Sequence, residues 1–209
     1  MENQPHIVPD AAVKGIARGL FLMASFSTIW TGIAFGGLNG TVYAFALAIF
    51  PVLAVFFVVK GIALHKLAKY FPQVTSDADK AEGKRMGKWF GIIFGAEGLL
   101  IFVGVNVVIN LGYPDLVIPT IALVVGLHFF PLAKVFKRTV DYYLATWATL
   151  VAVCGFIFTL NKTMPVNYIQ AFIGVGIALA TAGYGVYMVF SGNKVARIMP
   201  LTNEVVQPD

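Results

Sequence analysis

Two ionisable side chains stand out because they fall within long apolar stretches of the sequence. Glu97 lies within residues 94–99 (Phe-Gly-Ala-Glu-Gly-Leu), and His128 lies in the next apolar stretch along the chain. An ionisable group at the centre of a membrane-crossing helix costs roughly 2.5–3.5 kcal/mol on insertion scales, so it normally faces the protein interior or a wet cavity. A carboxyl and an imidazole at such a depth are typical of sites that bind protons, cations or small polar molecules. We therefore predict Glu97 and His128 as candidate ligand- or proton-binding residues.

The spacing of these two residues predicts that they lie at the same depth. Measured from Tyr113 in the intervening turn, Glu97 lies about 16 residues back and His128 about 15 residues forward, at about 1.5 Å of helix rise per residue. Equal depth on two antiparallel helices does not determine whether the side chains face each other. In the alternative interpretation, His128 is a structural residue that hydrogen-bonds a neighbouring backbone group or hydroxyl.

Three further residues are candidates for the same site. Trp30 lies too deep in its apolar stretch to belong to an interfacial aromatic belt, and Thr28 and Tyr184 belong to loose polar stripes on two other helices. Together they are candidates to line a cavity against Glu97 and His128. The simpler interpretation is that the stripes hold helices together by hydrogen bonds.

The helix that carries Glu97 has a second distinctive face. Its members are small or amide-bearing residues at near-helical spacing: Gly87, Gly91, Gly95, Asn106 and Asn110. Small residues let membrane helices approach closely, and asparagines can hydrogen-bond across the contact. Glu97 projects from a different face, together with Phe90, Ile93, Phe94, Ile101 and Gly104. A helix with protein on both faces would be central, so we expect this helix to form the core of the bundle.

The elements that position these residues are predicted to be six transmembrane helices. Of the 209 residues, 58% are hydrophobic and 12% are charged, with a mean hydropathy of +0.81. Soluble domains are about 45–50% apolar and about 25% charged, and a membrane-crossing helix needs about 20 apolar residues. Such runs occur at about 19–38, 41–59, 89–110, 116–133, 142–160 and 168–190. The fold class is therefore an all-α, polytopic membrane protein that forms a single membrane domain, with residues 60–88 as an amphipathic and charged connection.

The distribution of basic residues predicts the orientation of the chain. Of the 15 Lys and Arg residues, all but Lys162 fall before span one, after span six, or in the connections after spans two and four. Because basic residues concentrate in cytoplasmic loops, both termini and residues 60–88 are expected in the cytoplasm. The expected location is the plasma or inner membrane of a cell. Within the connection, residues 60–71 are interpreted either as an amphipathic continuation of span two into the lipid interface or as a solvated helix end. Residues 75–84 are interpreted as a flexible charged link.

Several function classes lack sequence support. The chain has no Walker P-loop, GxSxG, HExxH or dinucleotide motif. One cysteine and three histidines provide too few ligands for a metal cluster. Basic residues confined to short connections argue against nucleic acid as a partner, and no cofactor or catalytic residue is predicted.

Three functions remain compatible with the sequence. The first is a small transporter or ligand-handling membrane protein, in which Glu97 and His128 bind a proton, a cation or a small polar substrate. The second is a non-enzymatic assembly partner or regulator of a membrane complex, acting as a homo-oligomer or with another membrane protein. The third is a membrane-embedded enzyme that acts on a lipidic substrate with Glu97 or His128 as acid or base. The expected partner in every case is the lipid bilayer.

Overall fold

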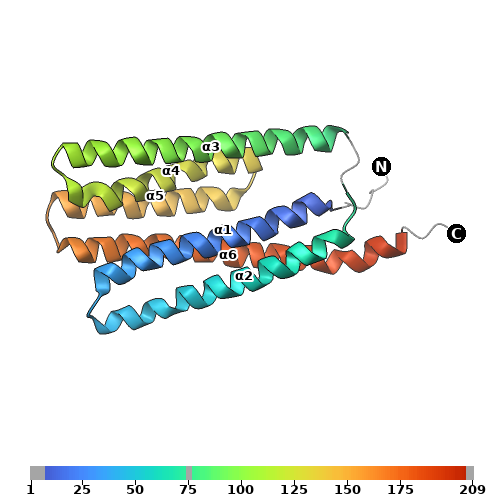
Figure 1. The fold of residues 1–209 in the computed structure, drawn as a ribbon, viewed down its shortest axis with the longest axis horizontal. Coiled ribbons are helices and arrows are strands. Elements are labelled where there is room, and N and C mark those ends of the chain that lie inside the picture. Colours follow the sequence, from blue (N-terminus) through green and yellow to red (C-terminus); the bar gives the residue numbers. More distant parts are fainter. Residues whose placement is uncertain (1–7, 74–76, 206–209) are drawn as a thin grey trace.

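The computed structural model describes residues 8–73 and 77–205, and its regular elements over these residues are all helical (Figure 1). The α-helices are α1 (Asp10–Leu38), α2 (Ile49–Leu67), α3 (Asp77–Asn110), α4 (Val117–Phe136), α5 (Thr139–Leu160) and α6 (Val166–Val205). Short 3-10 helices precede α2 (η1, Val42–Ala48), follow it (η2, Ala68–Tyr70) and precede α4 (η3, Pro114–Leu116). Six of these described helical segments are long and apolar enough to cross a membrane. This part of the predicted fold class is confirmed.

The helix boundaries agree with the sequence prediction best at the turns after α1, α3 and α5. α1, α3 and α5 end at Leu38, Asn110 and Leu160, as expected from the turn residues that follow. The helices extend beyond the apolar runs because charged residues also favour helices, whereas hydropathy marks only the apolar part. The amphipathic stretch after span two is helical through Tyr70 in the form of α2 and η2.

The expectation of a flexible link at residues 75–84 is wrong from Asp77 onward. α3 begins at Asp77, and its first turns carry two ion pairs. In each pair the partners are three residues apart: Lys80 with Asp77 at 3.3 Å, and Arg85 with Glu82 at 3.0 Å. Pairs at this spacing support exposed helices modestly. Residues 74–76 lie outside the described residues.

The bundle consists of two groups of three helices. α1 packs against α6 and α2, whereas α4 packs against α5 and α3, and the α5–α6 contact joins the groups. Figure 1 shows the resulting order, with α3 at one edge, α2 at the opposite edge, and α1, α4, α5 and α6 between them. Apolar clusters fill both groups and the contact between them.

The central helix is α6, and the expectation that span three forms the core is wrong. Of the six candidate spans, α6 is the most buried and α3 the least. α6 approaches α1 closely because Gly174 has no side chain: a Cβ there would lie 2.6 Å from the Ala34 backbone nitrogen and 2.8 Å from the Trp30 carbonyl oxygen. Gly174 thus permits a close helix approach, whereas Gly87, Gly91 and Gly95 on α3, for which that role was predicted, have no atom near their Cβ positions among the described residues.

Candidate functional site

Glu97 lies on the face of α3 that packs against α4. The buried and partly buried positions of α3 form one stripe, which includes Phe90, Ile93, Phe94, Glu97 and Ile101. Helical spacing predicted that Glu97 shares a face with these residues, and their burial confirms it. α4 is the one α-helix with which α3 makes an extensive contact among the described residues.

The turn between α3 and α4 aligns the two helices. Gly112 has a φ of 83°, in the left-handed region that favours glycine, and the Tyr113 amide donates to the Val108 carbonyl at 2.9 Å. The Gly112 amide donates to the Ile109 carbonyl at 3.0 Å, so the end of α3 is capped before the chain reverses. α4 therefore runs back antiparallel to α3 and carries His128 to the level of Glu97.

The two ionisable side chains contact each other across the helix interface. Nδ1 of His128 lies 3.5 Å from Oε1 of Glu97, with 7% of the His128 side chain and 10% of the Glu97 side chain exposed. This distance is longer than the about 2.7–2.9 Å of a strong charge-assisted hydrogen bond. Nδ1 is buried and makes no hydrogen bond with the described residues. The pair can thus share or exchange a proton after a small approach of the two side chains.

Aromatic rings surround the imidazole. The Phe94 ring lies edge-on to it at a centroid distance of 5.5 Å, and the Phe129 ring lies at 4.2 Å. Phe90 continues this packing through its ring contact with Phe94, at 4.4 Å. An apolar surrounding strengthens electrostatic interactions within the pair and makes an unpaired charge unfavourable.

The other three candidates are placed elsewhere in the bundle. Trp30 is buried in the cluster that α1 shares with α6, and Tyr184 belongs to the cluster formed by α1, α2 and α6. Thr28 is exposed, and its hydroxyl donates to the Ala24 carbonyl at 2.8 Å. The structure therefore brings together Glu97 and His128 but not Trp30, Thr28 and Tyr184, and the expected common cavity is not formed by these five residues.

The predicted packing stripe of α3 lies on its uncovered face. A Cβ at Gly87, Gly91 or Gly95 would meet no atom within 4 Å in the part of the chain that is described. The exposed Asn106 and Asn110 side chains donate to carbonyls four residues back in their own helix, at 2.7 and 2.8 Å. Among the described residues, no helix packs against this stripe, and a packing role for it remains a prediction that involves a second polypeptide.

A second buried polar cluster was missed by sequence reasoning. Arg138 Nη1 donates to the Tyr184 hydroxyl at 3.1 Å, and the carboxyl of Asp141, which is 2% exposed, lies close to both side chains. Oδ1 of Asp141 makes no hydrogen bond with the described residues. Asp141 was overlooked because it lies at the edge of an apolar run, beside residues interpreted as interfacial. The available signal was a lone carboxyl three residues after the lone arginine of the same connection.

The described residues hold no cluster of three or more His, Cys, Asp and Glu side chains that could bind a metal ion. Glu97 and His128 alone supply two ligands, whereas protein metal sites commonly use three or four. The chemistry that this arrangement supports is proton exchange and the binding of a small polar or cationic group.

The sequence matches no protein-family model, and searches of curated proteins and of solved structures find no similar protein.

Proposed function

We propose that this chain is a multi-pass membrane protein that handles protons together with a small polar or cationic solute, with Glu97 and His128 as the exchanging pair. The observation that carries the proposal is the buried contact between these two side chains, 3.5 Å apart. In the proposed orientation, both termini are cytoplasmic in the plasma or inner membrane, because the basic residues concentrate at that end of the helices.

The net charge of the pair depends on how many protons it holds. With one shared proton it is either an ion pair or two neutral groups, and its net charge is zero in both forms. An added proton leaves a cationic pair, whereas loss of the shared proton leaves an anionic pair that attracts a cation. Burial of both side chains makes either charged form unfavourable unless a solute or counter-charge compensates it.

The packing of α3 against α4 links the charge of the Glu97–His128 pair to the position of α3. α3 packs extensively against α4 among the described helices, and Glu97 and His128 lie within that contact. A change in the charge of the pair therefore alters the free energy with which α3 packs on α4. If the solute binds the two arrangements of α3 with different affinities, proton binding and solute binding are coupled.

Proteoliposomes that contain a trapped pH-sensitive dye test the proposal. Sodium, potassium or tetramethylammonium chloride is added outside, and the internal pH is followed for wild type and for Glu97→Gln. We expect at least one salt to move protons through the wild type, and Glu97→Gln to reduce that rate at least tenfold. Glu82→Gln is the matched control, because Glu82 is an exposed carboxylate paired with Arg85. Equal rates in wild type and Glu97→Gln, or a wild type that moves no protons with any salt, contradict the proposal.

A second function, as an assembly partner in a membrane complex, is favoured by the uncovered face of α3. Gly87, Gly91 and Gly95 leave open space beside this helix, and two asparagines extend the face. In lipid, such a face is stabilised by a close-packed helix from another polypeptide.

Substitution at the middle of the stripe tests this second function. Gly91→Leu should leave the fold intact, because nothing in the described structure lies near its Cβ position, and should abolish co-purification of the partner or of a second copy. Gly32→Leu is the matched control, since that position is also open but lies on the exposed face of α1. Unchanged association in Gly91→Leu contradicts an assembly role for this face.

A further inference from the structure

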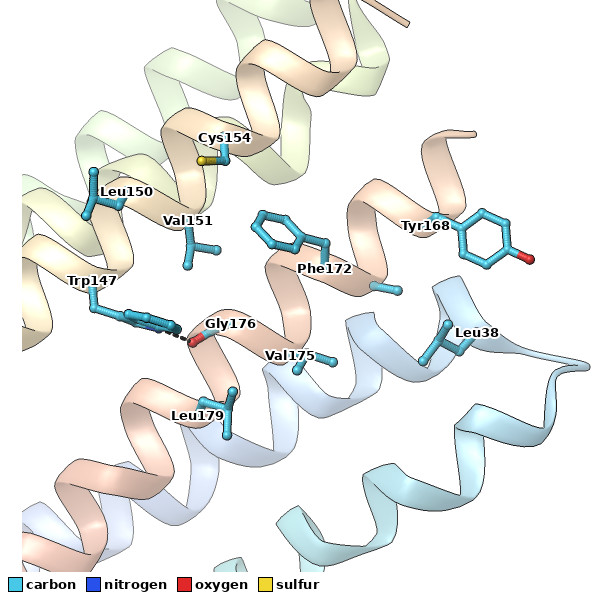
Figure 2. A pocket seen from close by; sticks show the side chains of 11 residues that line it. Leu38, Trp147, Leu150, Val151, Cys154, Tyr168, Phe172, Val175, Gly176 and Leu179 are labelled. Carbon is cyan, nitrogen blue, oxygen red and sulfur yellow. Dashed lines mark hydrogen bonds between the residues drawn. The ribbon is translucent and has the colours of Figure 1, made fainter. Parts of the chain in front are cut away.

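An apolar groove lies between α5 and α6, away from Glu97 and His128. It is bounded by residues 147–154 of α5 and 168–179 of α6, with Leu38 of α1 at one end (Figure 2). Its volume is about 620 Å³, within the roughly 300–1,000 Å³ typical of small-molecule sites. We propose that this groove binds one hydrocarbon chain of a phospholipid whose headgroup lies at the α5–α6 loop.

The groove opens sideways along its length, as a lipid site must. Val151, Ala171 and Gly176 are buried and form its floor, whereas Leu150 and Leu179 on its rims are 58% and 51% exposed. A chain can therefore enter from the surrounding bilayer without any helix moving. The same apolar rims would disfavour the entry of a water-soluble ligand.

The length of the groove matches one leaflet. Tyr168 and Leu179 mark its two ends on α6, eleven positions apart, which corresponds to about 16 Å of helix at 1.5 Å per residue. The hydrocarbon core of a bilayer is about 30 Å thick, so each leaflet supplies about 15 Å. The groove is thus as long as one leaflet is deep.

A tryptophan closes the deep end. Nε1 of Trp147 donates to the Gly176 carbonyl at 2.8 Å, which fixes the indole between the two helices (Figure 2). The side chain is 49% exposed, so its ring surface is available to the groove. Because the indole N–H is satisfied by this bond, the surface that it offers is apolar, as the end of a hydrocarbon chain requires.

The open end carries the groups that a phosphate headgroup would meet. Tyr168 lines this end of the groove, and the α5–α6 loop, which joins the two walls, contains the exposed Lys162. Lys162 makes no ion pair among the described residues. A basic residue near a membrane surface favours anionic lipids by about 1 kcal/mol, or roughly fivefold. The expected ligand is therefore an anionic glycerophospholipid.

Native mass spectrometry of the detergent-purified protein, after mixing with phosphatidylglycerol or phosphatidylcholine, tests this inference. We expect one phosphatidylglycerol per wild-type chain. Val175→Trp should lose that lipid because it fills the groove. Leu100→Trp, on the exposed face of α3, should retain it and controls for the added indole. Equal retention by both variants contradicts the inference.

Lys162→Gln provides a second variant that leaves the groove unfilled. It should retain lipid but lose the roughly fivefold preference for phosphatidylglycerol over phosphatidylcholine. An unchanged preference contradicts the role of Lys162, and a wild type that carries no phospholipid, or that fills the groove by dimerising, contradicts the lipid assignment. None of these measurements depends on Glu97, so failure here is distinct from failure of the proposed proton-linked function.

Discussion

Nδ1 of His128 lies 3.5 Å from Oε1 of Glu97, and these atoms belong to the two helices, α3 and α4, whose contact attaches α3 to the bundle. The pair is therefore placed where its interaction energy directly affects the packing of an edge helix. A buried pair at the centre of a bundle would be held by contacts on all sides. At this edge, a change in the interaction energy of the pair acts mainly on the α3–α4 interface.

The contact between Glu97 and His128 should appear as a coupling energy. In a double-mutant cycle with Glu97→Gln and His128→Asn, we expect a coupling of roughly 0.6–2 kcal/mol in the free energy of unfolding, the range for polar contacts between membrane helices. Denaturation of the purified protein by a strong detergent measures it. The cycle of Glu97→Gln with Asn110→Ala is the control and should be additive, because Asn110 bonds its own helix. Additivity in the first cycle would show that the two side chains do not interact.

The close approach of α6 and α1 should make Gly174 intolerant of a side chain. Gly174→Ala places a Cβ against the Ala34 backbone, and overpacking of this kind costs roughly 1–3 kcal/mol. Gly183 is the matched control on the same helix, because a Cβ there meets no atom of the described residues within 4 Å. Thermal unfolding in detergent should show a lower midpoint for Gly174→Ala and no loss for Gly183→Ala. Equal midpoints would contradict the α1–α6 packing.

The Tyr184 hydroxyl should matter because it accepts a hydrogen bond from Arg138 beside the buried Asp141. Tyr184→Phe removes this hydrogen bond and leaves the partly buried Arg138 without its partner, which costs about 1–3 kcal/mol. Tyr187→Phe is the control: its ring stacks on Tyr184 at 5.9 Å, but its hydroxyl makes no hydrogen bond with the described residues. The free energy of unfolding should fall for Tyr184→Phe and change little for Tyr187→Phe. Similar effects of both substitutions would indicate that ring packing, not the hydroxyl, stabilises this end of the bundle.

The proposed orientation can be tested by cysteine labelling in a Cys154→Ser background, which removes the one native cysteine. A membrane-impermeant maleimide added to intact cells should label Thr163→Cys, in the α5–α6 loop, and leave Lys84→Cys unlabelled. Opening the cells should expose Lys84→Cys. Labelling of Lys84→Cys in intact cells would reverse the assignment of sides.

The length of the apolar runs identified the six helices, and turn residues marked three of their ends. The ends at Leu38, Asn110 and Leu160 follow from such turns, and the equal depth of Glu97 and His128 follows from counting residues along two antiparallel helices. That these side chains face each other depends on the rotation of each helix about its axis, which the buried stripe of α3 indicates only in part.

Tertiary arrangement could not be predicted in the same way. Glycines at a spacing of four are compatible with a packed interface or with an uncovered face, and the structure places those of α3 on an uncovered face. Gly174, which does permit a close approach, stands in an equally apolar sequence. The separation of Trp30 and Tyr184 from Glu97 depends on which helices become neighbours, and short loops specify this for consecutive helices alone.

Infrared difference spectroscopy of the reconstituted protein between acidic and alkaline pH measures most directly whether the Glu97–His128 pair exchanges protons with its surroundings. In the wild type, we expect a carbonyl-stretch band of a protonated carboxyl in an apolar environment to disappear as the pH rises. The band should be absent in Glu97→Gln, retained in Asp141→Asn, and shifted in His128→Asn because the partner of the carboxyl has changed. A spectrum of Glu97→Gln identical to that of the wild type would contradict a proton-exchanging role for this pair.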